Sequence, residues 1–177
     1  DEFLQRFKRG EQFNKDSIKI NSKETYTTLR KGRIVYGGGG ILPDVFVPMD
    51  TSETSNYQQS LIRMGVYNTF TLDYLDKNRK DMQRRYPDLK AYMSGFAIDD
   101  KILSDFVKHG EEKKVNCDTA QLARSKNLIK HQLKALIARD LFGMSAYFQV
   151  MNPIDDKAYG EALELIRNWK ATSKKYL

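Results

Sequence analysis

The sequence predicts a mainly α-helical protein, in which a domain of about five to seven helices follows a short β-rich segment. Apolar residues recur at helical spacing through most of residues 51–177. Glycine, proline and short runs of β-branched residues are instead concentrated in residues 30–50. We therefore divide the chain into an irregular segment, residues 1–50, and a helical domain, residues 51–177.

The first segment carries one helical pattern and two strand patterns. Residues 1–12 place apolar side chains on one helical face, and Gly10 is the expected stop. Residues 13–29 are rich in polar side chains and are expected to form an extended connector. The runs Ile34–Tyr36 and Val45–Val47 have β-type composition and are bracketed by glycines and prolines, so we expect short strands there.

Capping and breaking residues set the helix limits in the second segment. Thr51-Ser52-Glu53 supplies N-terminal capping groups, Gly65 interrupts a helix, and Pro87 ends one. Asp118-Thr119 caps the longest helix. The predicted helices cover about residues 53–63, 66–85, 119–141 and 144–151, with two others beginning at Asp99-Asp100 and at Asp155-Asp156. In the last helix Ala158, Ala162, Ile166 and Trp169 are expected to face inward.

Composition limits the class of protein. The chain has 177 residues, which suits one domain or one domain with a fragment. No apolar run reaches the ~18 residues that a membrane-spanning helix needs. Cys117 is the single cysteine, which excludes an internal disulfide framework and a zinc finger. We expect it to be a small buried thiol or a bystander.

The net charge of +7 raises the question of an anionic partner. Lys126, Lys130 and Lys134 share one helical face, which is compatible with a membrane surface or a nucleic acid but is typical of a solvated face. The chain has no concentrated basic stripe interleaved with aromatic platforms. We therefore expect no nucleic-acid partner.

The motifs that carry chemistry are incomplete. Gly37–Gly40 could cradle a phosphate, but an extended segment follows instead of a helix, so we expect a tight turn or a close backbone crossing. His109 and His131 are far apart and lack companion ligands at metal-binding spacing. We expect His109 to meet the last carbonyls of its helix, and both histidines to have structural or surface roles.

Paired carboxylates and serines also give no site. Neighbours on a helix point about 100° apart, so Asp99-Asp100, Glu111-Glu112 and Asp155-Asp156 are expected to cap helices or face solvent. No serine stands in a Gly-x-Ser-x-Gly or Ser-x-x-Lys motif. The sequence therefore predicts no catalytic, cofactor-binding or metal-binding residue. The aromatic residues Phe142, Tyr147, Phe148 and Trp169 are expected to pack in the core.

Residues 32–48 are more distinctive than a pattern of short strands, glycines and prolines requires, and two later stretches accompany them. Residues 32–48 read GRIVYGGGGILPDVFVP, residues 133–141 read LKALIARDL, and residues 147–152 read YFQVMN. Together with the opening DEFLQRFKRGEQFNKDSI, they resemble the carboxy-terminal region of bacterial carboxy-terminal processing peptidases, also called tail-specific proteases. The resemblance covers nearly the whole chain.

The resemblance implies a serine endopeptidase of the periplasm or cell envelope that uses a lysine as general base. In that family the nucleophile and the lysine precede the Gly-Ile-x-Pro-Asp element, and Ser17 and Ser22 do not match the nucleophile motif. We therefore expect a non-catalytic portion, inactive alone, that packs on the protease core, positions protein or peptide substrates or mediates self-association. The alternative is a free-standing helical interaction module with a mildly basic face.

Overall fold

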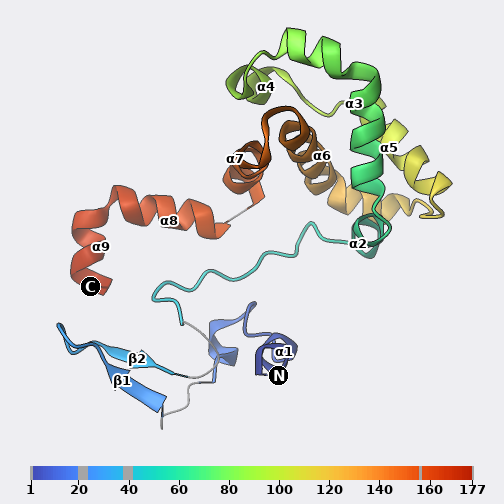
Figure 1. Cartoon of the computed structure of the whole chain (residues 1–177). Coiled ribbons are helices and arrows are strands. Elements are labelled where there is room, and N and C mark those ends of the chain that lie inside the picture. Colours follow the sequence, from blue (N-terminus) through green and yellow to red (C-terminus); the bar gives the residue numbers. More distant parts are fainter. Residues whose placement is uncertain (1, 20–23, 38–41, 156, 177) are drawn as a thin grey trace. The chain divides into compact units, whose positions relative to one another are not determined.

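The computed structural model describes residues 2–19, 24–37, 42–155 and 157–176. It is mostly helical with one small two-stranded sheet, so the predicted mainly α class is confirmed (Figure 1). The chain divides into two compact units, which are residues 51–160 and residues 1–50 with 161–177. The sequence-based division had instead kept residues 51–177 together.

A short helix and a buried carboxylate organise the beginning of the first unit. Helix α1 spans Glu2–Lys8, and the chain turns at Gly10, whose φ of +72° suits glycine. Glu11 is buried and accepts from Arg6 and Arg9, each at 2.7 Å. The hydrogen bond from Arg6 is the main reason that the pKa of Glu11 lies below its usual value. A 3₁₀ turn, η1, follows at Lys15–Ser17.

The strands of the first unit form an antiparallel hairpin. Strand β1 (Thr25–Thr27) pairs with β2 (Ile34–Tyr36), with Tyr26 opposite Val35. The prediction of β2 is confirmed, whereas β1 lies in the expected connector, where Thr-Tyr-Thr has high strand propensity. The predicted strand Val45–Val47 is wrong. It lies between Pro43 and Pro48, which lack the amide hydrogen that a ladder requires.

The glycine run is described only at its first residue. The amide of Gly37 donates to the carbonyl of Glu24 at 2.6 Å, and a Cβ atom there would lie 2.8 Å from the Tyr26 ring. Gly37 therefore permits a close backbone approach, as the sequence predicted for the run. Residues 38–40 lie outside the described residues.

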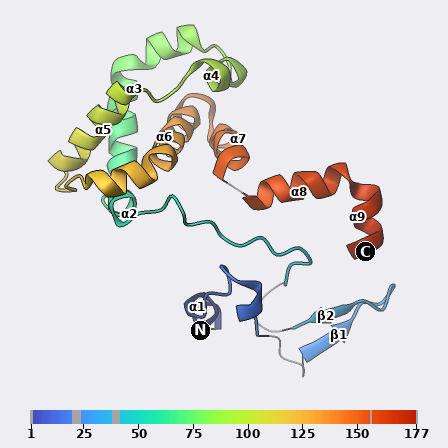
Figure 2. The same ribbon diagram turned by 180° about the vertical axis from the view of Figure 1, so that it is seen from behind.

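The second unit is built around one long helix. Figures 1 and 2 show α6 (Thr119–Phe142) at the centre of the helical part, and it contacts α2, α3, α4 and α7. Ile129, Leu133 and Ile137 of α6 are fully buried, as are Tyr92 and Phe106 from its neighbours. The helices around it are α2 (Asn56–Arg63), α3 (Val66–Arg85), α4 (Leu89–Gly95), α5 (Asp100–Glu112) and α7 (Met144–Asp155).

Side-chain caps fix where these helices begin. Asp99 and Asp118 accept from backbone amides of α5 and α6, as predicted. Helix α2 begins later than expected because Ser55, not Thr51–Glu53, is its N-cap. Helix α4 was not predicted; it has only seven residues, and Asp88 caps it immediately after Pro87. Gly65, with a φ of +67°, separates α2 from α3.

Two helices end the chain, α8 (Lys157–Arg167) and α9 (Trp169–Tyr176). They bring the helices described beyond residue 51 to eight, one above the predicted range, because α4 was missed and the last helix is divided in two. The prediction that Ile166 and Trp169 face inward is wrong, since both are more than half exposed. No described residue of α8 is buried, so its apolar face enters no core. None of the described helices combines the length and apolar character that crossing a bilayer requires.

Candidate functional site

The predicted basic face of α6 is tied to neighbouring helices. The Nζ atoms of Lys126 and Lys130 lie 3.1 and 2.9 Å from Oδ1 of Asp100 on α5. Lys134 donates to the carbonyl of Met93 on α4 at 2.8 Å. The predicted solvated face is therefore partly exposed, and its lysines also bridge α6 to α4 and α5, which the sequence did not predict.

The lysine bridge predicts a pH dependence. Hydrogen bonds from Lys130 and then Lys126 lower the pKa of Asp100 below its usual 3.8. The bridge therefore stabilises the fold above about pH 3.8 and is lost as the pH falls through the lowered value. We expect Asp100→Asn to have a lower melting temperature than wild type at pH 7, with the two values converging as the pH falls well below 3.8. A constant difference across a calorimetric pH series would contradict this account.

His109 links α5 to α3. Its Nε2 atom lies 2.8 Å from Oγ1 of Thr69, and its Nδ1 atom lies 3.9 Å from carboxylate oxygens of Asp73 and Glu112. The sequence had placed this side chain at the last carbonyls of its own helix, so the structural role is confirmed but the partner is different. Thr69 Oγ1 also lies 3.3 and 3.2 Å from the carbonyl oxygens of Gly65 and Val66, so its single hydroxyl proton is shared among three neighbouring acceptor positions.

The remaining sequence candidates stay dispersed. Asp99 serves as the predicted cap, and His131 lies half-buried in the middle of α6. Cys117 is half-buried beside Tyr57, and burial raises the pKa of that phenol. Within the described residues, His, Cys, Asp and Glu form no group of three or more that could hold a metal ion.

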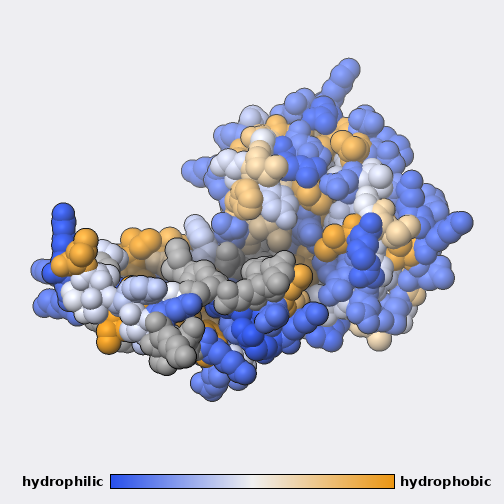
Figure 3. Space-filling model, turned by 60° about the horizontal axis from the view of Figure 1, so that its bottom comes forward, coloured by the Kyte–Doolittle hydropathy of each residue, from blue (hydrophilic) through white to orange (hydrophobic). Residues whose placement is uncertain are grey.

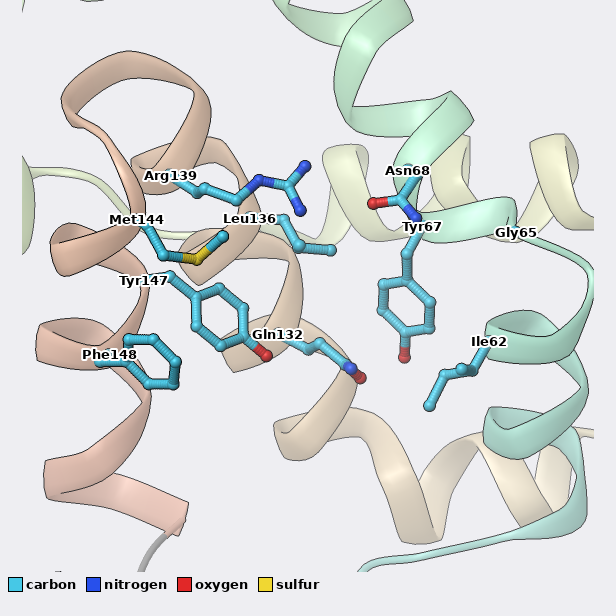
Figure 4. A pocket seen from close by; sticks show the side chains of 10 residues that line it. All are labelled: Ile62, Gly65, Tyr67, Asn68, Gln132, Leu136, Arg139, Met144, Tyr147 and Phe148. Carbon is cyan, nitrogen blue, oxygen red and sulfur yellow. The ribbon is translucent and has the colours of Figure 1, made fainter.

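A groove in the second unit combines apolar walls with polar side chains. It has a volume of about 300 Å³ and lies between α2, α3, α6 and α7 (Figure 4). Its apolar walls come from Ile62, Leu136, Met144 and Phe148. On the face drawn in Figure 3, hydrophobic residues, in orange, are scattered over a mostly hydrophilic surface. The other lining residues are Gly65, Tyr67, Asn68, Gln132, Arg139 and Tyr147.

The sequence did not predict this groove. Phe142 packs against Tyr92 as expected, with ring centroids 5.7 Å apart, and Tyr147 is half-buried. Phe148, however, is 51% exposed, so its predicted burial is wrong. Successive residues of α7 point in different directions, and only one face of α7 can meet α6. The sequence feature that could have indicated the groove was the i, i+3, i+4 spacing of Met144, Tyr147 and Phe148, directly after the turn at Gly143.

Polar groups lie at the bottom of the same groove. Tyr67 is 3% exposed, and its hydroxyl has no hydrogen-bond partner among the described residues. The Gln58 side-chain amide donates to Oε1 of Gln132 at 3.2 Å and also lies beside this phenol, where it opposes the effect of burial on the pKa of Tyr67. Burial raises the pKa of Tyr67, so this group is a neutral hydrogen-bond donor at physiological pH.

Comparison with known proteins gives one match. The model of a family of unknown function (DUF8443) matches residues 57–143 of this chain, just under half of its length. The matched range runs from α2 to the turn after α6 and contains the residues of the groove that precede α7. No curated protein and no solved structure matches the chain.

Proposed function

We propose that this chain is the non-catalytic carboxy-terminal portion of a carboxy-terminal processing serine endopeptidase of the periplasm or cell envelope. In this proposal residues 1–50 complete the peptidase core. The helices of the second unit pack on that core, position substrate chains or mediate self-association. The resemblance of residues 32–48 to the family motif is the sequence support for the proposal.

The exposed hairpin is the structural observation that supports the proposal best. All of β1 is exposed, and so are Ile34 and Tyr36 of β2. A lone two-stranded hairpin is marginally stable in water, and hairpins gain stability when further strands extend them into a larger sheet. Such a hairpin suits the margin of a larger sheet supplied by a peptidase core.

The lysine bridges weigh against the alternative, a free-standing module that binds anions through a basic face. Lys126 and Lys130 share Asp100, and Lys134 is held by a backbone carbonyl. Binding a polyanion would compete with these contacts. The alternative predicts salt-dependent binding to nucleic acid, which titration against single-stranded DNA at two salt concentrations would detect.

Active-site labelling tests the absence of a catalytic centre. We expect a fluorophosphonate reagent to leave the intact mass of this chain unchanged, and unfolded casein to remain uncut, because the serine nucleophile and its base lie outside the chain. Trypsin treated in parallel controls the reagent. Casein cleavage that stops when one serine of this chain is labelled would contradict the proposal.

A further inference from the structure

The groove holds more hydrogen-bonding capacity than its own contacts use. Arg139 donates through Nε and one Nη to the carboxylate of Asp140, at 2.8 and 3.3 Å. A guanidinium group has five N–H donors, and these two contacts use two of them. Figure 4 shows the rest of the Arg139 guanidinium directed toward the open centre of the groove, across from Asn68.

Charge at this corner favours an anion. Nη1 of Arg79 donates to the main-chain carbonyl of Asp140 at 3.1 Å, so a second guanidinium group lies near the residue whose carboxylate pairs with Arg139. Among the described residues that line the groove, Arg139 alone carries charge. Because Asp140 holds the guanidinium plane in place, its outer edge is oriented to receive a second carboxylate.

The Tyr67 hydroxyl is the second unused donor. It lies between the side chains of Gln132 and Ile62 in Figure 4, and a buried hydroxyl without a partner has a free-energy cost that an acceptor would remove. A backbone carbonyl of an extended peptide is such an acceptor. The exposed side chains of Met144 and Phe148 provide an adaptable apolar wall beside it.

We propose that this groove binds a short peptide segment of a partner protein, in which an acidic side chain is flanked by apolar ones. The carboxylate pairs with the outer edge of Arg139, a main-chain carbonyl accepts from Tyr67, and the apolar side chains cover Ile62 and Met144. The volume of about 300 Å³ suits a few side chains rather than a whole helix. The proposal applies whether or not the chain is joined to a peptidase core.

Pools of short peptides test directly whether the groove binds such a segment. The probe is a pool of tetrapeptides with blocked ends, apolar-Glu-apolar-apolar, in which each apolar position is Leu, Ile, Met or Phe. With ¹³C-methyl methionine labelling, we expect the Met144 methyl signal to shift saturably and that of Met93, an exposed methionine on α4, to stay unchanged. Replacing Glu by Gln in the pool should weaken binding about tenfold, since one charge-assisted hydrogen bond is replaced by a neutral one.

Variants show where the peptides bind, measured as saturation transfer from the protein to the peptide signals in NMR. Met144→Glu should abolish this transfer, while the matched variant Met93→Glu should leave it intact. Arg139→Gln should remove the preference for Glu over Gln, and circular dichroism checks its fold.

Four outcomes would overturn the proposal. The first three are a Met144 signal that does not shift, equal affinity for the Glu and Gln pools, and tighter binding of an all-apolar pool with free carboxy termini. The fourth is a Met144 shift caused by raising the protein concentration alone, which would assign the groove to a second copy of this chain.

Discussion

Replacing Phe106 by alanine is expected to lower the free energy of unfolding by about 3–5 kcal/mol. Phe106 is fully buried on α5, and its ring lies 4.9 Å from Tyr67 and 5.3 Å from Phe70, centroid to centroid. Truncation therefore removes buried apolar surface and leaves a cavity between α3 and α5. The measurement is urea unfolding followed by circular dichroism.

Phe148→Ala is the matched control for Phe106→Ala. It removes the same atoms from a ring that is 51% exposed, so the expected loss is below about 1 kcal/mol. Equal losses in the two variants would contradict the described core, since they would mean that α5 is not packed on α3. Phe148→Ala also separates stability from groove binding, because it should weaken peptide binding while leaving the fold intact.

Replacing Ser125 by alanine is expected to cost about 1–3 kcal/mol of unfolding free energy. Ser125 Oγ is buried and lies 2.7 Å from the carbonyl of Glu53 and 2.8 Å from Oγ of Ser55. A hydroxyl has one hydrogen, so Ser125 donates to Glu53 and accepts from Ser55, which in turn accepts from the amide of Gln58. The substitution breaks this chain where residues 53–55 enter the helical unit.

The control for Ser125→Ala is Ser94→Ala on α4. Ser94 is exposed, and its hydroxyl lies near the carbonyls of its own helix, so the expected change is within about 0.5 kcal/mol. Thermal unfolding of the two variants gives the comparison. Indistinguishable melting temperatures would show that the Glu53–Ser125 contact contributes nothing to stability.

Local signals predicted much of the fold. Gly65 and Pro87 mark the ends of α3, and Asp99 and Asp118 are the caps that the sequence indicated. Such features act within a few residues, so periodicity and capping chemistry suffice to find them. Helix α4 was missed because seven residues hold too few turns to show a period.

Features that depend on distant partners could not be predicted. The spacing of Lys126 and Lys130 is the same for a solvated face and for a face bridged to Asp100, and the difference lies in how α5 packs on α6. Trp169 has the spacing of a core residue yet is exposed, since periodicity reports that a face is apolar but not what covers it. The groove likewise depends on how four helices meet.

The complete reading frame of the gene provides the most direct measurement of the peptidase assignment. Sequencing should reveal an encoded peptidase domain in frame with residues 32–48 and immediately before Asp1. That domain should contain a nucleophilic serine and a lysine base. A continuous open frame that carries an unrelated domain there, or none, would contradict the assignment.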